Sequence, residues 1–378
     1  MKKVDFYQCI EVKNKGDKEI KRLNRLSAEK IIYNADRLID IRDKGDTYPV
    51  HMAIGITDYC NHKCIFCNTE YATADKSRIH TIDRKKLIEF LKQAKEMGLK
   101  AVTICGSGEP LIYPEIKELL YEIKDIKLGI GIFTNGFKLT KDIREAILDT
   151  CTFVRCSINA SNSEEHEVVH QIKDNFDIII KNVDELVKEK RQRNCNLPTI
   201  GTQFVFYEEN YRSIVEATKL WKKVGVDYFE IKPLIEGEGS AVGIKVFPAK
   251  DKAEVRYQMQ LAKELEDEKF SVYTKYGQYL NSIAEQSRSY KKCYGHSLSA
   301  NLWSDGNLFI CPNQEHEKDI IGNIYENTFL EIWNGEKRKK RMEKIHVKEC
   351  PRGCRCDSLN EIIWDYLHPD ELIHPNFI

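Results

Sequence analysis

The chain has 378 residues, 59 basic and 59 acidic side chains, and 42% hydrophobic residues. This length suits two or three compact units, and zero net charge argues against a protein that coats nucleic acid or an anionic membrane. No apolar run approaches the ~20 residues of a membrane span, and the N-terminus lacks the apolar core of a secretory signal. We therefore expect a cytoplasmic chain whose 13 cysteines are reduced, and clustered thiols in that setting indicate a metal site.

The predicted elements begin with a polar N-terminal extension, residues 1–48, which has an amphipathic helix over 26–43. Residues 49–235 then alternate short apolar strands with longer helical patterns. The strands are predicted at 50–56, 101–105, 128–133, 153–158, 200–206 and 228–234, and the helices include 84–97, 115–123, 141–149, 176–190 and 214–224. Six such units predict a parallel sheet covered by helices. Without a GxGxxG fingerprint, they favour an α/β fold of the partial (β/α)6 barrel type, with its chemistry at the carboxyl ends of the strands.

Two further segments follow the predicted barrel. Residues 236–290 form a bridging segment with a long charged helix over 250–269, and residues 291–378 form a small α+β domain with five cysteines. The basic run at 337–341 is expected to be a solvated helix face, because the chain as a whole is neutral.

Three cysteines lie in the loop after the first predicted strand, at CxxxCxxC spacing: Cys60, Cys64 and Cys67. They are the right number to bind three irons of a [4Fe-4S] cluster, which leaves the fourth iron open to an external ligand. His62 is a conceivable fourth ligand, so the spacing alone also permits a structural zinc site.

This loop, with Phe66 directly before its last cysteine, resembles the CxxxCxΦC signature of the radical S-adenosylmethionine (SAM) enzymes. The resemblance implies that Cys60, Cys64 and Cys67 hold a [4Fe-4S] cluster. It also implies that the open iron binds the methionine part of SAM and that Phe66 lies near the adenine.

The segment after the second strand, Cys105-Gly106-Ser107-Gly108-Glu109-Pro110, is similar to the GGEP turn of the same family. The resemblance implies that the backbone at Gly106 and Gly108 approaches SAM closely. It also implies that Glu109 accepts a hydrogen bond from the SAM ammonium group.

The fourth and fifth strands carry weaker matches. Ser157 and Asn159 stand where the family has a Ser-Ile-Asp segment near the SAM ribose and carboxylate, with asparagine in place of the usual aspartate. Gln203 falls in a stretch of the fifth strand that is similar to a SAM-contacting segment.

The C-terminal cysteines form a second group, in which a hairpin turn signal at 304–308 separates Cys293 from Cys311, and Cys350 and Cys354 follow. Spacing alone allows a zinc ribbon or an iron–sulfur cluster. The hairpin and the Leu-Glu-Ile-Trp-Asn segment at 330–334 resemble the SPASM/twitch extension of radical SAM enzymes. The resemblance implies one auxiliary [4Fe-4S] cluster on these four cysteines, with Cys356 as the rival of Cys354. The cysteine spacing is most similar to the aminocyclitol dehydrogenase subgroup.

The resemblance implies reductive cleavage of SAM to a 5′-deoxyadenosyl radical, with flavodoxin or ferredoxin as the electron donor. The radical would abstract a hydrogen atom from a small polar substrate such as a sugar or an aminocyclitol, and the auxiliary cluster would assist its oxidation. One alternative is epimerisation, in which Cys105 returns a hydrogen atom. Cys156 is a poorer donor, because alternation directs it away from the face of Ser157. Peptide maturation and a non-catalytic zinc-binding interaction protein are further alternatives.

Four residues are candidate substrate contacts. Glu230 and Lys232 share one face of the sixth strand and would contact a polar substrate or form an internal ion pair. Glu70 and Tyr71 follow the first cysteine group and would line the same site.

Overall fold

The computed structural model describes residues 25–67, 79–235, 245–283, 288–311, 319–370 and 372. Within these residues a single sheet has the strand order β10-β9-β8-β1-β2-β3-β4-β5-β6-β7, in which β1 to β7 and β8 run parallel. The strands are β1 (His51–Gly55), β2 (Ala101–Cys105), β3 (Gly129–Thr134), β4 (Phe153–Ser157), β5 (Thr199–Phe206), β6 (Tyr228–Pro233), β7 (Ser271–Thr274), β8 (Ser299–Leu302), β9 (Asn307–Phe309) and β10 (Gly322–Asn323).

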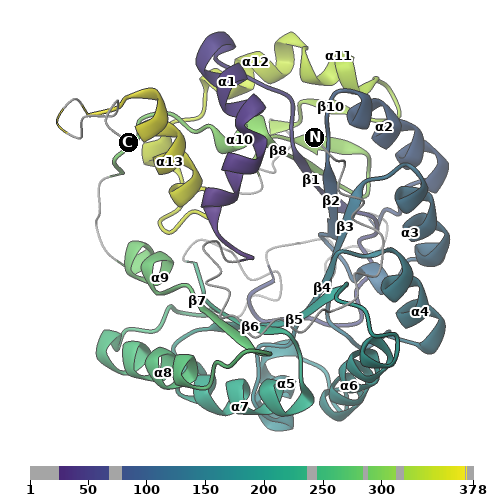
Figure 1. Cartoon of the computed structure of the whole chain (residues 1–378), viewed down its shortest axis with the longest axis vertical. Coiled ribbons are helices and arrows are strands. Elements are labelled where there is room, and N and C mark those ends of the chain that lie inside the picture. The colour runs from purple at the N-terminus through teal and green to yellow at the C-terminus, as the bar shows by residue number, and fades with distance from the viewer. Residues whose placement is uncertain are drawn as a thin grey trace.

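Helices cover the outside of this sheet, and Figure 1 shows β1 to β7 curving around a common axis inside them. The α-helices are α1 (Ala35–Lys44), α2 (Arg84–Glu96), α3 (Ile116–Asp125), α4 (Lys141–Thr150), α5 (Ser163–His170), α6 (Phe176–Gln192), α7 (Ile214–Val224), α8 (Lys252–Glu264), α9 (Tyr276–Ile283), α10 (Gly295–Leu298), α11 (Phe329–Trp333), α12 (Glu336–Glu343) and α13 (Asp357–Leu367). The 3-10 helices are η1 (Ala28–Asn34), η4 (Pro110–Ile112), η5 (Tyr211–Ser213) and η7 (Val347–Glu349). No helix in the described part of the chain is long and apolar enough to cross a membrane.

The partial barrel expected from the sequence is confirmed, with all six predicted strands present. The long helix expected over 250–269 is wrong, because α8 ends at Glu264. The side chain of Asp267 accepts hydrogen bonds from Lys269 N (2.9 Å) and Phe270 N (3.0 Å), which turns the chain into β7. β7 then pairs in parallel with β6 as a seventh strand that was not predicted.

The strands present alternate side chains to the helices and to the barrel interior. Met52 and Ile54 of β1 belong to the main hydrophobic core beneath the helices, which directs Ala53 and Gly55 inward. At the amino-terminal ends of the strands, which we call the lower interior, aromatic rings occupy the space inside the barrel. A Cβ added at Gly131 would lie 2.2 Å from the ring of Phe153, and one added at Gly201 would lie 2.1 Å from the ring of Tyr228.

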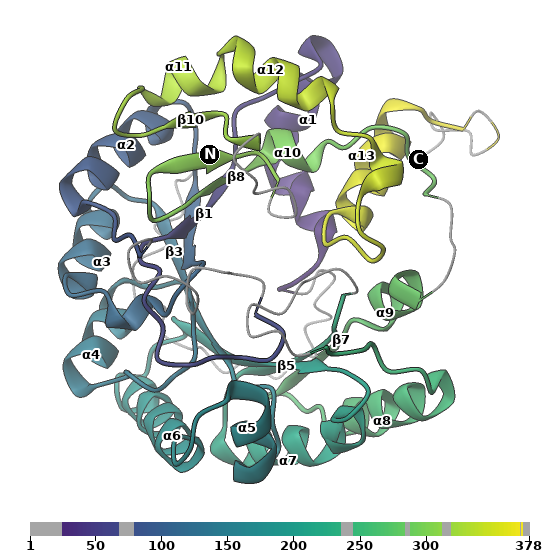
Figure 2. The same ribbon diagram turned by 180° about the vertical axis from the view of Figure 1, so that it is seen from behind.

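The C-terminal segment continues the barrel sheet. β8 pairs in parallel with the other side of β1, and β9 and β10 follow in antiparallel order. Figure 2 shows α11 and α12 outside this part of the sheet, and α13 beside the N-terminal helices. The N-terminal helices pack here as well, because Ile31, Ile41, Tyr294, Leu298 and Ile363 form one hydrophobic cluster.

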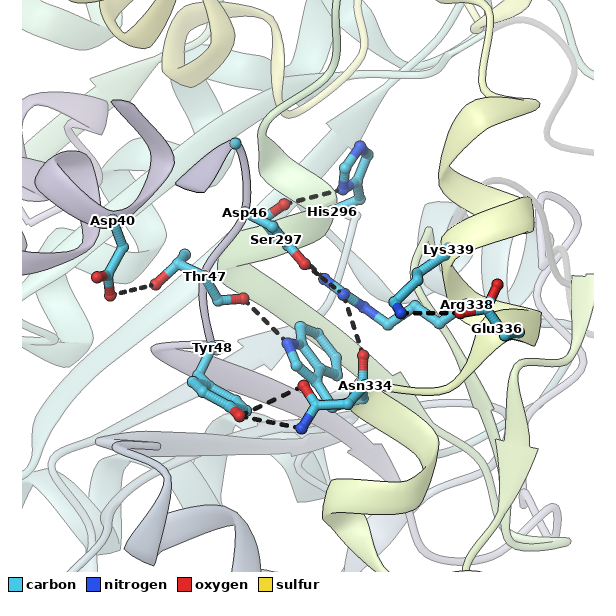
Figure 3. A network of polar contacts seen from close by, with 12 residues as sticks. Asp40, Asp46, Thr47, Tyr48, His296, Ser297, Asn334, Glu336, Arg338 and Lys339 are labelled. Carbon is cyan, nitrogen blue, oxygen red and sulfur yellow. Dashed lines mark hydrogen bonds and ion pairs between the residues drawn. The ribbon is translucent and has the colours of Figure 1, made fainter. Parts of the chain in front are cut away.

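A polar network fastens the linker before β1 to α11 and α12 (Figure 3). Arg338 binds both carboxylate oxygens of Asp46 at 2.6 and 3.0 Å and stacks over Trp333, whose Nε1 donates to the carbonyl of Thr47 at 3.0 Å. The expectation that residues 337–341 form a solvated face is therefore wrong at Arg338, which is 1% exposed. It is also wrong at Arg341, which pairs with buried Asp319 at 2.7 Å.

Candidate active site

The loop that leaves β1 carries Cys60, Cys64 and Cys67, and α5 holds it in place. Lys63 N donates to the carbonyl of His170 at 3.1 Å, and Ile65 N donates to that of Val169 at 2.9 Å. Cys67 N closes a turn by donating to Cys64 O at 3.0 Å. These backbone bonds keep the three thiols in one short, half-buried loop at the carboxyl end of β1.

Burial raises the pKa of Cys60 to about 12 and places the pKa of Cys64 well above its usual value. The charge of Glu109 raises the pKa of Cys60 further, and the charges of Cys67 and Cys60 raise that of Cys64. A bound metal centre would offset this burial and favour the thiolate forms of Cys60 and Cys64. Three thiolates with no fourth cysteine in the loop fit a [4Fe-4S] cluster that keeps one iron open, with Cys60, Cys64 and Cys67 as its ligands.

Buried histidines lie behind this loop, and sequence reasoning noted only His62. Donor atoms of His62, Cys64 and His170 lie within 4.8 Å of one another. His170 Nδ1 is 3.1 Å from Cys64 Sγ, and its Nε2 is 2.5 Å from the carbonyl of Ile158. His166 stacks on His170 at 4.4 Å, so their i, i+4 spacing on α5 was the available signal. Two imidazoles and a thiol are also zinc donors, so the zinc alternative has a partial donor set here.

The turn after β2 packs directly on the cysteine loop. A Cβ at Gly108 would lie 2.2 Å from the carbonyl oxygen of Tyr59, and Glu109 N donates to that oxygen at 2.7 Å. Gly106 has a φ of +116°, and a Cβ there would lie 2.5 Å from Gly55 Cα. Only glycine therefore fits at Gly106 and Gly108 without moving the backbone.

Glu109 is buried, and burial raises the pKa of its carboxyl group. The carboxylate accepts hydrogen bonds from Thr134 Oγ1 (2.6 Å), Asn135 N (2.7 Å) and Leu111 N (3.0 Å). Glu109 thus joins the carboxyl ends of β2 and β3 beside the cysteine loop. A contact with the SAM ammonium group stays a prediction.

Asp58 connects the cysteine loop to the C-terminal hairpin. Its buried carboxylate accepts hydrogen bonds from Ser107 Oγ, from Ser304 Oγ at 2.6 Å and from His80 N at 2.9 Å. Ser304 belongs to the turn between β8 and β9. Beside it, Trp303 covers β1 and β2, since a Cβ at Gly55 would lie 2.5 Å from its ring. The sequence did not single out Asp58, Trp303 or Ser304 because their contacts join segments about 250 residues apart.

A polar layer crosses the interior above the aromatic rings. Ser157, Gln203, Glu230 and Tyr273 stand in register across β4 to β7. Glu230 Oε2 accepts from Arg155 Nη1 at 2.9 Å.

The guanidinium group of Arg155 lies 3.5 Å from the ring centroid of Phe133. Glu230 therefore forms an internal ion pair, as one of the two sequence alternatives expected. Its partner is Arg155 and not Lys232, and the sequence did not indicate Arg155. Lys232 follows on the same interior face. Glu70 and Tyr71 lie outside the described residues.

The remaining predicted residues have separate surroundings. Asn159 has a φ of +51°, and its Oδ1 accepts from Val205 N at 2.8 Å, so this oxygen secures β5. The ring of Phe66 packs against Tyr207 with 6.2 Å between centroids. Cys156 is buried against the helices, as alternation predicted, and burial raises its pKa to about 12.

Cys105 ends β2 on the interior face, in register with Gly55. It is half-buried. A role as hydrogen donor stays a prediction.

The five C-terminal cysteines line one cavity. They are Cys293, Cys311, Cys350, Cys354 and Cys356. Cys356 and Cys354 adjoin each other, and a hydrogen bond from Cys356 lowers the pKa of Cys354. Thiols that converge from three chain segments, around residues 293, 311 and 350–356, fit a closed cluster that uses four of them.

Arg288 holds the loop that carries Cys350. It donates to the carbonyls of Val347 and Pro351, both at 2.7 Å, and to Asp357 Oδ1 at 2.9 Å. Because Asp357 begins α13, this arginine fixes the loop against the helix that follows the last cysteines. Sequence reasoning missed it, since no motif surrounds Arg288.

Two family models match the chain. Residues 54–230 match the radical SAM superfamily, and residues 293–357 match the iron–sulfur cluster-binding SPASM domain. These matches agree with the family and the C-terminal extension that the cysteine motifs predicted.

Individual relatives are distant. The tungsten-containing aldehyde ferredoxin oxidoreductase cofactor-modifying protein of Pyrococcus furiosus is 24% identical over 192 residues, about half of each chain (49% and 51%). Mycofactocin maturase MftC of Mycobacterium tuberculosis is 21% identical over 335 residues, which covers 84% of this chain and 81% of that protein. SuiB of Streptococcus suis, solved with S-adenosylmethionine, superposes with a TM-score of 0.64 at 19% identity over 83% of this chain and 72% of that one. This likeness confirms the fold.

Proposed function

Since the chain carries a radical SAM domain followed by a SPASM domain, we propose that it is an oxidoreductase acting on a small polar substrate in the barrel interior. Cys60, Cys64 and Cys67 would hold a [4Fe-4S] cluster that, with SAM bound, would supply the 5′-deoxyadenosyl radical. The C-terminal cysteines would hold an auxiliary [4Fe-4S] cluster that would accept the electron lost by the substrate radical. One observation carries the proposal. The C-terminal segment that gathers five cysteines around one cavity also places Trp303 and Ser304 against the carboxyl ends of β1 and β2.

The chain's own residues position the reactants. Gly106 and Gly108 let the turn after β2 pack against β1 and against the cysteine loop that would hold the SAM-binding cluster. Glu109 is held by three hydrogen bonds where it would accept from the SAM ammonium group. Arg155 and Glu230 offer a fixed donor and acceptor to a polar substrate. The aromatic rings below them fill the lower interior and exclude water.

The ligands of the first cluster would be Cys60, Cys64 and Cys67. Those of the auxiliary cluster would be Cys293, Cys311, Cys350 and Cys354, with Cys356 as the rival of the last. Flavodoxin or ferredoxin would supply the electron. Epimerisation with Cys105 as the hydrogen donor is the alternative outcome, supported by the interior position of this thiol at the end of β2.

Anaerobic reconstitution tests the proposal. About eight irons per chain and a broad absorbance near ~400 nm are expected for two [4Fe-4S] clusters. Reduction in the presence of SAM should then yield 5′-deoxyadenosine. A colourless, zinc-loaded chain would instead support the zinc-binding alternative.

Peptide maturation is a second candidate, favoured by two similarities. MftC, named a maturase, aligns with 84% of this chain. SuiB bound to its precursor peptide superposes with a TM-score of 0.61 over 88% of this chain. Incubating the reduced enzyme with short peptides encoded beside its gene separates the candidates. If mass spectrometry shows that a peptide loses two hydrogen atoms, the substrate is a peptide and not a small metabolite.

A further inference from the structure

Asn360, in the first turn of α13, lines the cavity that the five C-terminal cysteines form. Its side chain is 1% exposed. Its Oδ1 accepts hydrogen bonds from Tyr294 N at 2.7 Å and from Gly295 N at 3.0 Å. Its Nδ2 lies 3.5 Å from the sulfur of Cys293. One buried amide thus connects α13 to the segment that carries the first cysteine of this site.

The orientation of this amide is fixed by its surroundings. Backbone N–H groups only donate, so two of them at one end of the Asn360 side chain require the oxygen there. The NH2 group must then face Cys293. An amide N–H remains a suitable partner when the thiol becomes a thiolate, because it donates to the charged sulfur.

We propose that Asn360 is a positioning residue of the auxiliary cluster that donates an N–H to the Cys293 thiolate and raises the reduction potential of the cluster. This inference rests on the proposed auxiliary cluster with Cys293 as a ligand. Hydrogen bonds to cluster sulfurs stabilise the reduced form, which carries the greater negative charge. An acceptor of the substrate's electron requires a reduced form that is stable enough to be populated.

Arg288 acts on the same cavity in a different way. It holds the Cys350 loop through the carbonyls of Val347 and Pro351. Its replacement by glutamine is expected to lower the iron content, because the loop is no longer secured. Asn360 differs because it directs an N–H donor at the sulfur of Cys293. Its replacement should leave the cluster bound and change the reduction potential of that cluster.

The test is a redox titration of the full, reconstituted chain, followed by electron paramagnetic resonance. A Cys60→Ala, Cys64→Ala, Cys67→Ala variant assigns which transition belongs to the auxiliary cluster. Asn360→Asp keeps an oxygen for Tyr294 N and Gly295 N but loses the N–H donor. We expect it to retain iron and to lower the equilibrium constant for reduction about tenfold, which is about 59 mV for one electron.

Two further variants separate the hydrogen bond from the added charge. Ser358→Asp places a carboxylate on the same turn at an exposed position, and a clearly smaller shift is expected. Asn360→Leu removes the donor without adding charge, and a shift to lower potential is expected.

Three results would overturn the inference. They are an unchanged potential in both Asn360 variants, an equal shift in Ser358→Asp with none in Asn360→Leu, or loss of the auxiliary iron from both Asn360 variants, which would make the role purely structural. If the unsubstituted chain itself holds only about four irons, the proposed auxiliary cofactor fails instead, and iron analysis reports this separately.

Discussion

Arg155 and Glu230 face each other inside the barrel, where 16% and 7% of their side chains are exposed. Removing water from both charges is costly, and their attraction and hydrogen bond offset that cost. An ion pair in this position contributes little net stability relative to apolar residues. It does fix a donor and an acceptor in the layer that also contains Ser157 and Gln203. The proposed role of the pair in substrate positioning is therefore separable from its role in folding.

A double-mutant cycle makes that separation. Glu230→Leu leaves Arg155 buried and unpaired, and should lower the free energy of unfolding by about 3–5 kcal/mol. Adding Arg155→Met removes the stranded charge and should recover most of that loss. Urea denaturation measures both effects. The double variant should still form 5′-deoxyadenosine from SAM but make no product. Product formation at the original rate would contradict the assigned positioning role.

At the scale of elements, the turn between β8 and β9 lies on the turn after β2. Trp303 packs against Gly106, where a Cβ would lie 2.7 Å from its ring, and Ser304 reaches Asp58. The hairpin of the C-terminal segment is thus part of the wall at the carboxyl ends of β1 and β2. A substitution in either turn should therefore shift the backbone of the other.

Gly106→Ala tests this contact. The alanine meets Gly55 and Trp303 and must adopt a φ of +116°, so we expect a loss of stability of about 2 kcal/mol or more and weaker SAM binding. Calorimetry of SAM binding and thermal unfolding report the two effects. Gly277→Ala is the matched control. Its Cβ meets no atom within 4 Å in α9, and it should gain about 0.5–1 kcal/mol of stability with unchanged SAM affinity.

The repeated elements were predictable because their signals are local. Apolar runs of five to eight residues became β1 to β6 within two residues of the expected bounds. β7 was missed because its four residues follow a charged helix whose end depends on an Asp267 turn. The two groups of cysteines were visible from their spacing, and their role as cluster ligands stays a prediction. Arg155 and Asn360 were not visible, since their roles depend on which distant atoms they reach, and only the folded chain determines that.

The molecule as a whole is held together across its cysteine sites. β8 pairs with β1, Arg338 binds Asp46, and Asp58 binds Ser304. These contacts join the C-terminal segment to the start of the barrel at three separate places. We therefore expect the two parts to unfold together.

Asp46→Ala tests this coupling, because it leaves Arg338 buried without its carboxylate. The free energy of unfolding should fall by about 3 kcal/mol, because Asp46 is partly exposed, and a single transition should be retained. Near-ultraviolet circular dichroism and intrinsic fluorescence should report the same midpoint. Two separate transitions in the unsubstituted chain would show that the parts are independent.

Acid sensitivity follows from histidines that the fold keeps neutral. Burial lowers the pKa of His51, His166 and His296 to about 4. The positive charges of Arg355 and Lys30 lower that of His51 further. The unfolded chain binds these protons near pH 6.5, whereas the folded chain does not bind them until about pH 4. The contribution of these neutral histidines to the free energy of unfolding is therefore fully present above pH 6.5. It is lost as the pH falls towards 4, by up to about 1.4 kcal/mol per pH unit for each histidine.

Urea denaturation of the cluster-free chain between neutral and mildly acidic pH measures this slope. His51→Gln should flatten it by the share of one histidine, because glutamine can still bond to Thr103 and Ser299, the present partners of the ring, and does not titrate. His368→Gln, at an exposed position, should leave it unchanged. An equal slope in all three proteins would mean that His51 takes up its proton without unfolding, through an opening of the barrel interior to water.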